Sequence, residues 1–251
     1  MKALTFSAAL FLAAIARGET VRDNPETVVL LHGLGLRSWA MEGLAHSLRS
    51  EGFRVFNLSY PSRTLPIEQL ASDWLPSQLR AAGLAEGSRV SFVTHSMGGI
   101  ILRLYRRDHP DAYRGRVVMI APPNDGSAVV DHLKGFAPFR WFTGLNGVRL
   151  GTDAQSVPRT LGAWPIDAGE LGIIAGDNSL NPLFSSWLGG PDDGKVAVSS
   201  TRLAGMTDFI VLHHSHTWLQ WRADTAAQVR AFLRTGHFTP AQSPPAAAVA
   251  G

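Results

Sequence analysis

One serine in the chain stands where a nucleophile could be activated. Ser96 lies in T-H-S-M-G-G, between an apolar run of strand length at 89–94 and an apolar run at 97–107 that suits a helix. A serine hydroxyl is a poor nucleophile at neutral pH and needs a neighbouring base and an exposed position. A tight turn from strand to helix gives that exposure and sets the next backbone N–H at a helix N-terminus. We therefore predict a nucleophilic Ser96; a serine that only caps the helix is the alternative.

A group of histidines follows much later in the chain. The stretch L-H-H-S-H-T-W-L offers His213, His214 and His216 as candidate bases. Three histidines within four positions also suit a metal site. Zinc sites, however, need a third or fourth ligand in compatible geometry, and the chain contains no cysteine. We expect no metal and no other cofactor.

The elements that would position these residues alternate along the chain. Apolar runs of strand length are followed by amphipathic stretches of helical length, a pattern typical of a parallel sheet covered by helices. The 251 residues suffice for one substantial core, and the fold class is therefore α/β. The expected strands are 27–31, 54–58, 89–94, 117–121, 171–175 and 209–212, and the expected helices are 38–50, 67–82 (bent or interrupted by Pro76), 97–107 and 217–233.

The alternation breaks between 122 and 165, where glycine, proline and aromatic residues are mixed. Irregular stretches of this length inside a compact domain are usually functional covers or disordered loops, and the aromatic residues argue against disorder. We expect a cap or lid insertion at about 124–165 that contacts an apolar ligand; a satellite hydrophobic cluster is the alternative. The candidate residues of the substrate pocket are Phe136, Phe139, Trp141 and Phe142.

Two motifs carry a resemblance to a known family. The turn at Ser96 resembles the nucleophile elbow of the α/β-hydrolases, and V-V-L-L-H-G-L-G at 28–35 resembles their oxyanion loop. The elbow departs from the family at Thr94, where glycine is usual; a β-branched residue crowds the turn, and the two glycines at 98–99 relieve it on the other side. A-P-P-N-D-G-S at 121–127 is similar to the bacterial lipase/esterase-like branch. The resemblance runs from 28 to about 233 and implies the α/β-hydrolase fold, with helices on both faces of a mostly parallel sheet.

The resemblance also implies the roles of the site residues. In this family the nucleophile is followed by the acid and then by the histidine. His216, in S-H-T-W before the last helix, is then the base that acts on Ser96. Asp193 is the acid, because D-G-K-V resembles the D-G-x-V segment that bears the acid in many bacterial lipases, and Asp177 is the alternative acid.

The family's oxyanion hole is built from two backbone donors, which stabilise the charge that develops on a carbonyl oxygen. By resemblance, these donors are the N–H groups of Leu34 and Met97. His32 shapes the first of the two loops by packing and hydrogen bonding and is not the base.

The implied activity is hydrolysis of carboxylic esters with an apolar acyl chain, through an acyl-serine intermediate. An acyltransferase with the same triad and a non-catalytic binding protein of this fold are the alternatives, because one scaffold hosts several functions. The expected partners are a small-molecule or lipid ester and, transiently, a lipid interface. The basic residues form no run longer than two, so no nucleic acid is expected, and no specific protein partner is inferred.

The two ends of the chain differ from the rest. Residues 1–16 have one positive charge followed by an apolar stretch that closes with A-I-A, the pattern of a secretory signal peptide. We expect an exported protein, periplasmic or secreted, with a hydrolase domain at 17–239. Residues 240–251 are rich in proline and alanine and are expected to form a flexible tail.

Overall fold

The computed structural model describes residues 26–240. The predicted signal peptide and all but the first residue of the predicted tail lie outside this range, and export stays a prediction. Six parallel strands form a single sheet in the order β2-β1-β3-β4-β5-β6. The strands are β1 (Thr27–Leu31), β2 (Arg54–Leu58), β3 (Val90–His95), β4 (Val117–Ile120), β5 (Leu171–Gly176) and β6 (Asp208–Leu212).

The strand sequences follow from burial on both faces. The four inner strands, β1, β3, β4 and β5, are buried along their whole length and read as nearly continuous apolar runs, whereas the edge strands β2 and β6 are only partly buried. Two apolar clusters lie on opposite faces of the sheet. This arrangement confirms the predicted α/β class and the α/β-hydrolase type of fold.

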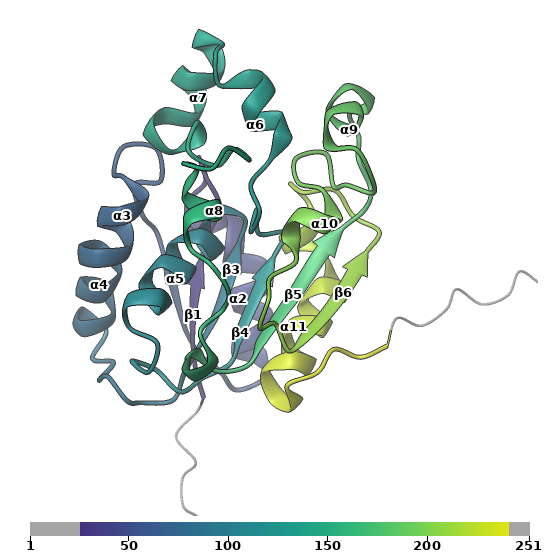
Figure 1. The fold of residues 1–251 in the computed structure, drawn as a ribbon. Coiled ribbons are helices and arrows are strands. Elements are labelled where there is room, and N and C mark those ends of the chain that lie inside the picture. The colour runs from purple at the N-terminus through teal and green to yellow at the C-terminus, as the bar shows by residue number, and fades with distance from the viewer. Residues whose placement is uncertain (1–25, 241–251) are drawn as a thin grey trace, which may run out of the picture.

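Helices cover both faces (Figure 1). One face carries α3 (Ile67–Gln69), α4 (Leu75–Ala81) and α5 (Met97–Asp108), and the other carries α2 (Glu42–Ser50) and α11 (Ala223–Thr235). Short 3-10 turns lie at Ser38–Met41, Ile166–Ala168 and Leu219–Trp221. In the described part of the chain, no helix is long and apolar enough to cross a bilayer.

Three expected helices differ from the prediction. The helix expected at 38–50 begins with a 3-10 turn, Ser38–Met41, and becomes an α-helix at Glu42. The helix expected at 67–82 contains a π-helical turn, Leu70–Trp74, and continues as α4 with Pro76 near its start. The wider turn directly before the proline accommodates a residue that has no N–H to donate. The helix expected to begin at 217 begins at Ala223 instead, because Arg222 has an extended backbone. The chain between β6 and α11 is therefore mostly a loop.

The segment that breaks the alternation holds three short helices. It contains α6 (Ala128–Leu133), α7 (Ala137–Gly147) and α8 (Val157–Thr160), and two more short helices, α9 (Pro182–Leu188) and α10 (Val198–Thr201), follow β5. In Figure 1, α6, α7 and α9 stand beyond the ends to which the strand arrows point. They therefore flank the carboxyl edge of the sheet, where ligands of open α/β sheets bind.

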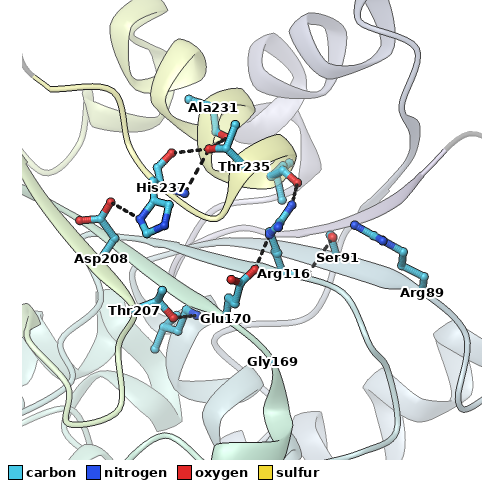
Figure 2. A network of polar contacts seen from close by, with 12 residues as sticks. Arg89, Ser91, Arg116, Gly169, Glu170, Thr207, Asp208, Ala231, Thr235 and His237 are labelled. Atoms are coloured by element: carbon cyan, nitrogen blue, oxygen red, sulfur yellow. Dashed lines mark hydrogen bonds and ion pairs between the residues drawn. The ribbon is translucent and has the colours of Figure 1, made fainter.

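Polar contacts fasten the opposite edge of the sheet (Figure 2). The guanidinium of Arg116, at the start of β4, pairs with Glu170 and donates to the carbonyl of Leu233 in α11, 2.9 Å away. The backbone N–H of Arg116 donates to the hydroxyl of Ser91 in β3. Because these contacts lie at the amino ends of the strands, they hold the frame together without occupying the carboxyl edge.

Candidate active site

Ser96 occupies a strained turn between β3 and α5. Its φ of 52° and ψ of −124° lie in a region that non-glycine residues rarely adopt, at a cost of about 1–3 kcal/mol. The turn is held by hydrogen bonds from Ser96 N–H to the Ile120 carbonyl, 2.8 Å, and from Gly99 N–H to the Ser96 carbonyl, 2.9 Å. The hydroxyl is thereby fixed at the N-terminus of α5.

Glycines let the loop after β1 approach this turn. A Cβ atom on Gly98 would lie 2.6 Å from the Leu31 carbonyl oxygen and 2.8 Å from that of His32. A Cβ atom on Gly33 would lie 3.2 Å from Cβ of Ser96. The backbone of the loop and the turn around the serine are therefore in direct contact, which only glycine at these two positions allows.

Thr94 departs from the family pattern but does not distort the turn. It is fully buried within regular β3, paired with Leu31 and Met119, and its φ is not positive. Its hydroxyl faces Gly99, where a Cβ atom would lie 3.3 Å from Oγ1. The absent side chain at position 99 thus gives the space that the extra side chain at position 94 takes.

Two side chains from loops distant in the sequence form a hydrogen-bonded chain that begins at the Ser96 hydroxyl. His216 Nε2 lies 2.9 Å from Ser96 Oγ, and His216 Nδ1 lies 2.7 Å from Asp193 Oδ2. The histidine and aspartate side chains are 5% and 0% exposed. With Nδ1–H donating to the carboxylate, Nε2 is left to accept the serine proton, which is the arrangement a general base requires.

The Asp193 carboxylate is fixed by its own loop. Its Oδ1 accepts hydrogen bonds from the backbone N–H groups of Lys195 and Val196, at 3.0 and 2.8 Å. The backbone of His216 also donates to the Asp193 carbonyl, 2.9 Å, so the two loops are joined through main chain and side chain. Gly176, at the end of β5, admits this junction, since a Cβ atom there would lie 2.4 Å from the His214 carbonyl oxygen.

The other candidate acid and histidines point elsewhere. Asp177 contacts His213, with 2.9 Å between Oδ1 and Nδ1, and the His213 side chain is 78% exposed. His214 contacts Asp224, with 2.6 Å between Nε2 and Oδ2. Each of the three histidines therefore faces a different carboxylate, and only His216 reaches Ser96.

The two expected oxyanion donors belong to the two segments that meet at Gly33 and Gly98. Met97 N–H is the first of α5, and Leu34 N–H belongs to the loop after β1. Within residues 26–240, neither N–H group donates a hydrogen bond to another residue. Both donors are thus unused, as backbone groups that stabilise a tetrahedral oxyanion must be.

His32 shapes the loop that carries Leu34. Its Nδ1–H donates to the Gly33 carbonyl, 2.8 Å, its Nε2 accepts from Tyr60 N–H, 3.2 Å, and its ring stacks on the Tyr60 ring at 4.0 Å. Burial lowers the pKa of His32 to about 4, so the ring is neutral at pH 7. Ser62 adds a second tie, because its hydroxyl accepts from Gly35 N–H at 2.9 Å.

A cleft of about 580 Å³ opens beside the loop. Its walls come from three segments, 35–37, 59–64 and Gly144 in α7. The lining includes neither Ser96 nor His216. Of the four aromatic residues expected in the substrate pocket, Phe139 packs on the core, whereas Phe136, Trp141 and Phe142 are more than 60% exposed, and their contact with a substrate stays a prediction.

Residues 28–251 match the sequence model described as the alpha/beta hydrolase family. The chain belongs to this family. Over 107 residues it is 29% identical to "Probable esterase PIR7A" of Oryza sativa subsp. indica, which covers 40% of this chain and 41% of that protein. The match thus spans about two fifths of the curated relative.

Solved structures of similar fold agree with the assignment. The mature lipase BlEst2 of Bacillus licheniformis superposes with a TM-score of 0.62 at 17% identity, covering 84% of this chain and 92% of that one. A carboxylesterase from Nitrososphaera gargenis gives a TM-score of 0.57 at 16% identity, covering 84% and 90% of the two chains. At these identities the likeness establishes the shared fold.

One residue of this alpha/beta hydrolase site was missed from the sequence. His95 is buried, its ring lies 5.1 Å from that of His216, and its Nε2 is 3.1 Å from the His216 carbonyl oxygen. Burial and, secondly, the charge of a protonated His216 lower the pKa of His95 well below its usual value. A histidine directly before the candidate nucleophile is the signal that could have found it.

Proposed function

We propose that the protein is a serine esterase that hydrolyses carboxylic esters through a Ser96–His216–Asp193 triad. The observation that carries this proposal is the continuous chain of hydrogen bonds, at 2.9 and 2.7 Å, that joins a serine in a strained turn to a buried histidine and a buried carboxylate. Membership of the alpha/beta hydrolase family and similarity to esterases and lipases support it.

In the first half of the reaction, His216 Nε2 takes the proton of Ser96 while Oγ bonds to the ester carbonyl carbon. The Leu34 and Met97 N–H groups stabilise the negative oxygen of the tetrahedral intermediate. The bond between carbonyl carbon and alcohol oxygen then breaks, and the proton on His216 moves to the leaving alcohol. Asp193 stays ionised throughout and holds the imidazole in the orientation that keeps Nε2 toward the serine.

In the second half, water attacks the acyl-serine and gives its proton to His216 Nε2. The carboxylic acid leaves as the proton returns to Ser96 Oγ, so the enzyme ends as it began. Exposed apolar side chains support an apolar acyl chain and transient contact with a lipid interface: Phe136, directly before α7, and Trp141, Phe142 and Leu145 within it. Export, suggested by residues 1–16, belongs to the same proposal.

Hydrolysis of p-nitrophenyl esters of increasing chain length by the wild type and by Ser96→Ala tests the proposal. We expect the variant to fold and to lose turnover, because one small hydroxyl is removed. Full turnover in Ser96→Ala would refute the assignment. A fluorophosphonate, which reacts with activated serines, separates the alternatives. Labelling of Ser96 without ester hydrolysis, but with ester formation when an alcohol is added, would favour an acyltransferase. No labelling at all would favour a binding protein.

A further inference from the structure

The cleft beside the loop that carries Leu34 has a distinctive charge. Its lining contains the two arginines Arg37 and Arg63, together with Ser59, Ser62 and Thr64, and no carboxylate. At about 580 Å³ it is large enough for a small organic ligand. A cavity lined by two positive charges and several hydroxyl groups favours an anion over a neutral or cationic ligand.

Neither arginine has its charge paired within the protein. Between residues 26 and 240, no carboxylate lies within 4.0 Å of either guanidinium. Several other arginines, in contrast, do pair with acids, among them Arg149 with Glu68 and Arg159 with Asp125. The two cleft arginines thus retain donors for an external carboxylate or phosphate.

Arg63 is held in place, so its charge is positioned in advance. It donates to the carbonyl of Trp141, and its guanidinium carbon lies 5.9 Å from the centres of the Trp141 and Phe142 rings. Its Nε is buried and, in the described part of the chain, has no hydrogen-bond partner. The contacts with Trp141 and Phe142 therefore limit the positions that the Arg63 guanidinium can take.

The wall that carries Arg63 is fixed to α7. Asn146, fully buried, donates from its amide to the carbonyls of Ser62 and Leu65, both at 2.8 Å, and accepts from Ile67 N–H at 3.1 Å. Gly144 has a φ of +64°, and a Cβ atom on it would lie 2.2 Å from the Arg63 carbonyl oxygen. The cleft is therefore preformed.

We propose that this cleft binds an anionic group, a phosphate or a carboxylate, carried by the ester substrate itself. The inference rests on the proposed function and adds a substrate class to it. Gly35 lines the cleft and directly follows Leu34, whose N–H is a proposed oxyanion donor. The cleft thus begins one residue from that donor, close enough for an anionic group of the same substrate to reach it.

Two matched substrate pairs test the proposal and separate the two sources of charge. Mono-p-nitrophenyl glutarate and p-nitrophenyl valerate differ in a carboxylate on the acyl side. Dibutyroylglycerol 3-phosphate and tributyrin differ in a phosphate on the alcohol side. For each pair the neutral ester is the internal reference, and the measured quantity is the ratio of kcat/KM for the anionic and the neutral member.

We expect Arg63→Gln and Arg37→Gln each to lower this ratio about tenfold for one of the pairs, mainly through KM, as for loss of a hydrogen bond to a charged group. Arg37 is exposed, so its variant folds even where Arg63→Gln does not. Arg54→Gln, which removes an exposed arginine at the amino end of β2, is the control and should leave the ratio unchanged. An unchanged ratio in both cleft variants overturns the proposal.

Titration of butyl phosphate, with butanol as the neutral control, into Ser96→Ala separates the two proposals from each other. Binding of butyl phosphate that is weakened about tenfold when Arg63→Gln is added supports the cleft even where no ester is cleaved, in which case the proposed function fails alone. Ester hydrolysis without anionic preference and without butyl phosphate binding means that the cleft proposal fails alone.

Discussion

The ring of His95 supports the backbone of His216. The two residues are 121 positions apart in the chain, and His95 Nε2 lies 3.1 Å from the His216 carbonyl oxygen. Because the pKa of His95 is strongly lowered, its ring is neutral at pH 7. Its Nδ1 has no hydrogen-bond partner among residues 26–240, so the proton belongs on Nε2 and is donated to that carbonyl.

His95 is therefore a positioning residue, and its variants should show this. We expect His95→Phe, which keeps the ring but removes the donor, to lower kcat about tenfold. His95→Gln, whose amide reaches the position of Nε2, should recover most of the loss. The measured quantities are kcat for a p-nitrophenyl ester and, as a control for folding, the Tm of each variant. Equal kcat in both variants would show that the donor has no role.

The close approach of the first loop to the nucleophile turn predicts that Gly98 is indispensable. Gly98→Ala places a methyl group 2.6 Å from a main-chain oxygen, which the backbone can relieve only by shifting. We expect the free energy of unfolding to fall by about 2 kcal/mol and kcat to fall with it. Gly43→Ala is the matched control.

Gly43 lies on the exposed side of α2, and a Cβ atom there would meet no other atom within 4 Å. Its alanine variant should gain about 0.5–1 kcal/mol of unfolding free energy, because alanine favours a helix. Urea unfolding of both variants measures these changes. A Gly98→Ala protein as stable and active as the wild type would contradict the tight contact.

The two candidate acids give opposite predictions. Asp193→Asn removes the charge that fixes the His216 ring, and we expect kcat to fall about 1,000-fold or more. Asp177→Asn changes a surface contact to His213, and kcat should stay within about twofold. Steady-state kinetics of the two variants decide between them, and the reverse order would reassign the acid.

Buried neutral histidines predict a loss of stability in acid. The pKa of His32 is lowered to about 4 by burial, whereas in the unfolded chain it is about 6.5. Between these values the unfolded state binds a proton that the folded state does not, so stability falls as pH falls from about 6.5 to about 4. From this shift, His32 contributes about 3 kcal/mol to that loss.

The lowered pKa of His95 acts in the same direction. Urea unfolding of the wild type and of His32→Asn between pH 7 and pH 4.5 measures the effect. The variant should be less stable at pH 7 and should lose less stability on acidification. Parallel pH dependences in the two proteins would show that His32 is not responsible.

Local signals explain how much of this arrangement could be predicted from the sequence. The strands are continuous apolar runs, and Ser96, Asp193 and His216 each lie in a short motif of their own, so the residues that the structure brings together could be named in advance. The helices of the 122–165 segment are short and interrupted by glycine and proline, and their periodicity is too brief to read. The late start of α11 depends on the extended backbone at Arg222, which no local pattern indicates.

The cleft that contains Arg37 and Arg63 could not be predicted from the sequence for a different reason. Arg37, Arg63 and Gly144 come from three separate segments, and only the tertiary fold unites them. In the sequence, these arginines are indistinguishable from those that pair with acids on the surface. The role of His95 likewise depends on a contact across 121 positions.

Reaction of the folded protein with a fluorophosphonate, followed by mass mapping of its peptides, tests the central claim most directly. The reagent bonds covalently to a serine whose proton is taken by a neighbouring base. We predict one label per chain, on Ser96, and its loss in His216→Ala, which removes that base. Ester hydrolysis that proceeds while Ser96 stays unlabelled, or with the label on another serine, would contradict the account.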